Sequence, residues 1–93
     1  MRLTTIPQWS GGFIPFARVS HAKYMVVDGR RAWIGTSNWE REYFSASRNL
    51  GLIVEGKSTG AQLEAIFASV WNSSYATPVD PSAHYEAPKI DEK

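Results

Sequence analysis

The chain has 93 residues, a formal net charge of +1 and no cysteine. This length fits one small domain, and the missing cysteines exclude a disulfide framework, a thiolate metal site and a cysteine nucleophile. The charge is uneven, because residues 1–57 hold eight Lys and Arg against four acids while residues 58–93 hold two against five. The first part is therefore the better candidate for binding an anion.

The N-terminal part is predicted to be mostly extended. Residues 2–6 favour a short strand that ends at the turn-rich segment 7–12. From Phe16 to Val27 the chain is rich in β-branched and aromatic residues, which predicts a long extended stretch. The abrupt start resembles a strand entered from upstream sequence, so we expect a truncated N-terminus.

A β-hairpin is predicted next. Asp28 and Gly29 tolerate the left-handed conformations of a tight turn, and the return strand is expected at residues 31–35. Residues 36–48 indicate an irregular loop with one helical turn near 39–44. Alternating side chains predict a further strand over residues 49–55.

An amphipathic helix is the clearest element of the C-terminal part. It is expected over residues 60–72, because apolar residues recur there at spacings of three and four, namely Leu63, Ile66, Phe67, Val70 and Trp71. Residues 77–93 contain three prolines without apolar periodicity, which favours an extended or disordered tail. We therefore expect a half-domain at residues 1–76 followed by this tail.

The hairpin carries a cluster of groups suited to a phosphate. His21 and Lys23 are two residues apart on the expected strand, so their side chains are predicted to share one face. An imidazole can attack phosphorus or protonate a leaving oxygen, while an ammonium neutralises the non-bridging oxygens. Asn38 returns to the same end of the hairpin, and Thr36 and Ser37 add hydroxyl groups there.

Each of these residues has a simpler interpretation when it is taken alone. A single histidine on a strand is usually structural, Lys23 would be a solvated charge, and Asp28 before a glycine would be a turn residue. Their joint spacing favours the functional interpretation.

The joint pattern resembles a known motif. It consists of His-x-Lys, four further residues and Asp28, followed after six residues by Gly35, Thr36, Ser37 and Asn38. This arrangement is similar to the repeated motif of the phospholipase D superfamily, in which two half-sites form one catalytic centre without a metal or other cofactor. The resemblance implies that His21, Lys23 and Asn38 are catalytic, and that the motif residues with structural roles are Asp28, Gly35, Thr36 and Ser37.

The resemblance also implies a fold, a reaction and a partner. Over residues 13–76 the chain is similar to the C-terminal half of the branch with lysosomal 5′-exonuclease and poxvirus envelope phospholipase-like members. The implied fold is α/β, a partial phospholipase D-like lobe with a mixed β-sheet, the motif hairpin and a C-terminal amphipathic helix. The implied enzyme hydrolyses phospholipid or single-stranded nucleic acid through a phosphohistidine. Its second half-site would come from the same parent chain or from a homodimer.

A non-catalytic interpretation remains open beside this one, in which the chain is a fragment or assembly module that retains the motif without turnover. One departure from the family pattern bears on it, since Asn49 stands where many relatives place a carboxylate that orients a histidine. Outside the motif, four residues are candidates for facing the substrate: Trp9, Trp39, Arg18 and Arg41.

Overall fold

The computed structural model describes residues 1–91 of the chain. These residues divide into two compact units, one formed by Met1–Ser20 with the segment that begins at Ser69, and the other by His21–Ala68. The boundary expected after residue 76 concerns a different division of the chain and stays a prediction. Each unit is described by itself below.

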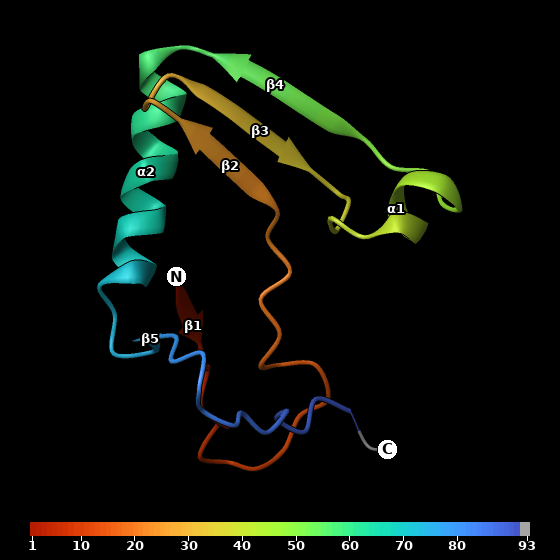
Figure 1. The fold of residues 1–93 in the computed structure, drawn as a ribbon, viewed down its shortest axis with the longest axis vertical. Coiled ribbons are helices and arrows are strands. Elements are labelled where there is room, and N and C mark those ends of the chain that lie inside the picture. Colours follow the sequence, from red (N-terminus) through yellow and green to blue (C-terminus); the bar gives the residue numbers. More distant parts are fainter. Residues whose placement is uncertain (92–93) are drawn as a thin grey trace. The chain divides into compact units, whose positions relative to one another are not determined.

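The unit His21–Ala68 is built on a three-stranded antiparallel sheet (Figure 1). Its strands are β2 (Tyr24–Val27), β3 (Arg31–Gly35) and β4 (Gly51–Glu55), in the order β2-β3-β4. The return strand of the hairpin therefore has the predicted bounds, and the strand expected at residues 49–55 begins two residues later. The α/β class is confirmed. A mixed sheet was expected, and the strands of the described residues form two sheets whose pairings are antiparallel.

The hairpin turn follows the prediction in its backbone conformation. Asp28 and Gly29 have φ angles of 54° and 62°, both in the left-handed region that favours such residues. The N–H of Arg30 donates to the carbonyl of Val27 at 3.1 Å and closes the turn. Asp28 thus acts here as a turn residue.

Two helices follow β3 and β4. The short helix α1 (Arg41–Ser45) is the helical turn expected in the loop, and α2 spans Lys57–Trp71. The predicted start of the long helix at residue 60 is three residues late, because the N–H of Gly60 already donates to the carbonyl of Gly56 at 3.2 Å. Gly60 lies against the hairpin turn, where an added Cβ would collide with the carbonyl group of Gly29.

The other unit contains a second, two-stranded sheet. Strand β1 (Arg2–Thr4) pairs antiparallel with β5 (Ala76–Pro78), with Leu3 opposite Thr77. The guanidinium of Arg2 lies over the Trp71 ring, 4.8 Å from its centroid, and donates to the Trp71 carbonyl. These contacts connect the two ends of the chain within this unit.

The extended stretch predicted from Phe16 to Val27 is wrong in its first part. A turn forms instead, in which the N–H of Ala17 donates to the carbonyl of Ile14 at 3.3 Å and Phe16 has a φ of 62°. Pro15 favours this turn because its φ is fixed near the value that the second residue of a turn requires. Strand pairing begins only at Tyr24.

Few side chains are buried. Among residues 1–91 the apolar side chains classed as buried are those of Ala32 and Ala76. Five apolar side chains of β4 and α2 are more than two-fifths exposed: Leu52, Ile53, Ile66, Phe67 and Val70. No helix in the described part of the chain combines the length and the apolar character needed to cross a membrane.

Candidate functional site

Two of the three predicted catalytic residues line one cavity. Lys23 and Asn38 lie on the walls of a cavity of about 390 Å³, together with Trp39, which is a predicted substrate-facing residue. The remaining lining residues are Ala22, which precedes β2, Tyr24 and Met25 of β2, and Trp33 of β3. The fold therefore brings an ammonium, an amide and an exposed indole to the same opening. This combination suits an anion that carries a planar or apolar group.

His21 lies just outside this set of lining residues. Its side chain is exposed, and its backbone carbonyl accepts a hydrogen bond of 2.8 Å from the Lys23 ammonium. The prediction that both residues lie on a strand is wrong, because β2 begins at Tyr24. The Gly35 N–H still donates to the Lys23 carbonyl at 3.1 Å, while the next residue, Thr36, donates its N–H to the Leu50 carbonyl at 3.0 Å.

The loop that carries Asn38 is positioned by an aromatic pair. The rings of Trp33 and Trp39 meet edge to face, with centroids 5.9 Å apart and planes at 83°. The Trp33 indole has room because Gly35 and Gly51 face each other across β3 and β4, and an added Cβ on either would collide with it. Trp33 therefore supports the loop that carries Asn38.

A hydrogen-bond network closes the other side of the loop. The Thr36 hydroxyl donates to the Asn49 side-chain oxygen at 3.0 Å and accepts the Leu50 N–H at the same distance. The Asn49 amide in turn donates to the Tyr43 carbonyl at 2.7 Å and to the Ser47 hydroxyl at 2.8 Å. Asn49 therefore anchors the 36–50 loop. Its amide both donates and accepts within this network, which a carboxylate in the same place could not do.

Two other motif residues, Ser37 and Asp28, lie in the loop after β3 and in the hairpin turn. Ser37 is buried, with 5 % of its surface exposed, directly before Asn38. Asp28 is in the turn, at the opposite end of β2 from Lys23. These positions agree with structural roles, although the catalytic and structural assignments of the motif residues stay predictions.

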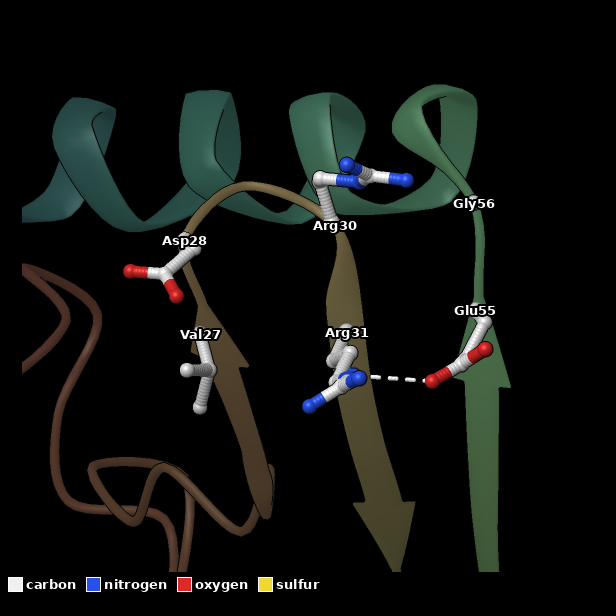
Figure 2. Close-up of a pocket in the computed structure, with 6 residues that line it drawn as sticks. All are labelled: Val27, Asp28, Arg30, Arg31, Glu55 and Gly56. Atoms are coloured by element: carbon white, nitrogen blue, oxygen red, sulfur yellow. Dashed lines mark hydrogen bonds and ion pairs between the residues drawn. The ribbon is translucent and has the colours of Figure 1, made fainter.

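A second pocket opens at the turn end of the hairpin (Figure 2). It has a volume of about 260 Å³, and its lining includes Asp28, Arg30, Arg31 and Glu55. Arg31 and Glu55 form an exposed ion pair with a distance of 2.8 Å, drawn as the dashed line in Figure 2. Two arginines and two carboxylates leave this pocket without net charge, so it is the weaker candidate for an anionic substrate.

The remaining substrate-facing candidates lie elsewhere. Arg41 is the first residue of α1 and is exposed. Trp9 and Arg18 line a separate and larger groove within the unit that contains β1 and β5. Across residues 1–91 the structure shows no group of three or more His, Asp or Glu side chains arranged to hold a metal ion.

Comparison with known families identifies the motif-bearing segment. Residues 5–71 match the family model described as "Cardiolipin synthase, PLD-like domain". The chain belongs to the phospholipase D superfamily. The matched residues include the whole cavity of Lys23 and Asn38, and they end at the last residue of α2.

Curated members of the phospholipase D superfamily are similar to most of this chain. The 5'-3' exonuclease PLD4 of Mus musculus is 38% identical over 89 residues, which cover 86% of this chain and 18% of the relative. The 5'-3' exonuclease PLD3 of Homo sapiens is 47% identical over 73 residues, or 75% of this chain and 15% of the relative. A probable phospholipase D of Caenorhabditis elegans is 41% identical over 76 residues, or 82% and 14%. The chain thus spans less than a fifth of the length of these relatives.

Proposed function

We propose that this chain supplies one half-site of a metal-independent phosphodiesterase, with single-stranded nucleic acid as its substrate. The observation that carries the proposal is the cavity that Lys23 and Asn38 both line. Ala22, which also lines this cavity, directly follows His21 in the sequence. Two of the similar superfamily members are named exonucleases, and the basic residues of this chain are concentrated in its first 57 positions. Both facts support a polyanionic substrate.

His21 would take one of the two histidine roles of the reaction. In the first step an imidazole nitrogen bonds to phosphorus, the bond to the leaving oxygen breaks, and the other histidine gives that oxygen a proton. In the second step water bonds to phosphorus, the phosphorus–nitrogen bond breaks, and the same second histidine takes the proton of the water. The Lys23 ammonium and the Asn38 amide would stabilise the non-bridging oxygens in both steps.

The second histidine would belong to a partner half-site. The motif occurs once in these 93 residues, and the other histidine, His84, follows β5 in the proline-containing tail. The proposed partner is a homologous half-site of the same parent chain or a second copy of this chain. Exposed apolar side chains on β4 and α2 support association with further protein surface.

The test is hydrolysis of a single-stranded oligonucleotide and of bis(p-nitrophenyl) phosphate in the presence of a chelator. His21→Ala is expected to reduce turnover roughly 10³-fold or more, because removing one histidine of the catalytic unit costs about as much as removing the whole unit. Lys23→Ala and Asn38→Ala are expected to reduce kcat by about 10²-fold, as the loss of one anion-stabilising donor does. His84→Ala is the matched control and should retain the wild-type rate. Near-normal turnover of His21→Ala would contradict the mechanism.

A non-catalytic role is the second candidate. It is favoured by one observation, namely that His21 is exposed and does not line the cavity of Lys23 and Asn38. Light scattering after gel filtration separates the two candidates when it is combined with the same assay. A strict monomer without hydrolysis would support an assembly module, whereas an active oligomer would support the phosphodiesterase.

A further inference from the structure

A cavity larger than that of Lys23 and Asn38 lies outside the half-site. It is a groove of about 640 Å³ within the unit of Met1–Ser20 and the segment from Ser69, and we refer to it as the Trp9 groove. Its lining includes Ile6, Gln8, Trp9, Arg18, Ser73 and Tyr75. The volume lies in the range of sites that bind small organic molecules.

One wall of this groove is an exposed indole that lies against a glycine turn. Trp9 is 64% exposed, yet its six-membered ring lies so close to Gly11 that any Cβ at this position would collide with it. The turn is closed by the Gly12 N–H, which donates to the Trp9 carbonyl at 3.1 Å. An exposed indole is a platform on which an aromatic base can stack.

A fixed cation lines the same groove. The Nε–H of Arg18 donates to the Ile6 carbonyl at 2.5 Å, a hydrogen bond that does not use the two terminal nitrogens of the guanidinium. None of the lining residues is acidic, so the charge of the groove is +1. This distinguishes the Trp9 groove from the pocket of Figure 2, where carboxylates balance the arginines.

We propose that the Trp9 groove binds one nucleotide of a single-stranded nucleic acid, with the base stacked on Trp9 and a phosphate on Arg18. This inference rests on the proposed function only for its substrate class. A nucleotide fits the groove chemically because it joins a planar aromatic group to an anion, and the lining hydroxyls and the Gln8 amide can pair with base edges. Ser20, which also lines the groove, directly precedes His21 in the chain.

The test is calorimetric titration with the hexanucleotide dT6 and with an abasic hexamer of equal charge, using the His21→Ala chain so that neither strand is cleaved. Trp9→Ala is expected to weaken dT6 binding roughly tenfold to hundredfold and to leave abasic binding unchanged, because only stacking is lost. Gly11→Ala should weaken dT6 binding while retaining the indole, since its Cβ displaces the ring. Arg18→Gln should reduce the slope of the logarithm of the binding constant against the logarithm of the salt concentration by about one, the loss of one phosphate contact.

Phe44→Ala and Arg48→Gln are the matched controls, because they remove an exposed aromatic ring and an exposed arginine outside the groove. Equal affinity for dT6 of the His21→Ala chain with and without Trp9→Ala or Gly11→Ala would overturn the proposal. Displacement of dT6 by phosphatidylcholine vesicles in a Trp9-dependent manner would also overturn it, in favour of an acyl chain. The two proposals can fail separately. Trp9-dependent binding of dT6 without hydrolysis by the wild-type chain would contradict the proposed function and still support the groove.

Discussion

The position of Asn38 depends on residues that lie outside the sequence motif. Trp33 on β3 reaches Trp39 edge to face, and it can do so only because Gly51 on the neighbouring strand has no side chain. Gly51 lies four residues before the end of β4, and nothing in the local sequence marks it as part of a site. Its role appears only when the register of β3 and β4 pairs it with Gly35.

Gly51→Ala is expected to destabilise the hairpin by about 1–3 kcal/mol, the usual cost of overpacking. The new Cβ would lie 2.8 Å from Nε1 of Trp33, so the indole must move and take Trp39 with it. Urea denaturation followed by tryptophan fluorescence measures the cost, and the hydrolysis assay should show a loss at the same time. In a Trp33→Phe background the smaller ring leaves room, so the additional cost of Gly51→Ala should shrink there. An equal cost in both backgrounds would contradict the proposed contact.

The hydrogen bonds between Thr36 and Asn49 could not be predicted from the sequence motif. Thr36 was predicted to be structural, which stays a prediction; the structure shows its hydroxyl hydrogen-bonded to Asn49 and Leu50. Asn49 was interpreted only as a missing carboxylate. In the structure its amide connects Thr36 with the carbonyl of Tyr43, a pairing that depends on loop geometry rather than on any spacing in the sequence.

The elements were predictable wherever a local signal sets them. The return strand β3 and the Asp28-Gly29 turn follow from turn chemistry, and α2 follows from its apolar period. The turn at Phe16 was missed although Pro15 is a local turn signal, because a bulky aromatic residue favours strands and rarely takes a positive φ. The pairing of β1 with β5 likewise has no local signal, since more than seventy residues separate Leu3 from Thr77.

The contact between α2 and the hairpin turn predicts an unusual response to a helix substitution. Gly60→Ala would stabilise a solvated helix by about 1 kcal/mol through helix propensity. Here the new Cβ would collide with the carbonyl group of Gly29 and lie 2.8 Å from the Arg30 nitrogen, and a backbone cannot yield as a side chain does. We therefore expect a lower Tm for Gly60→Ala. Ala61→Gly at the exposed neighbouring position should lower Tm by propensity alone, so a rise for Gly60→Ala would show that helix and turn do not touch.

The molecule as a whole leaves most of its large apolar side chains in contact with solvent. On the sheet these include Met25, Val27, Ile34, Leu52 and Ile53, each at least two-fifths exposed. Strands β2 and β4 are both edges of the described three-stranded sheet, so their outer backbone groups can also pair with another chain. A surface of this kind is typical of a segment that completes its core against further protein.

Mixing experiments distinguish a second copy from a different partner. If two copies of this chain build one site, each active centre needs His21 from both, and random pairing makes activity fall as the square of the wild-type fraction. At equal parts of wild type and His21→Ala, with the total concentration constant, about a quarter of the activity should remain under this symmetric arrangement. His84→Ala in place of His21→Ala should leave the activity unchanged. A linear fall with added His21→Ala would exclude the symmetric site. Absence of hydrolysis at every ratio would favour a half-site from the parent chain, because the mixture lacks that half-site.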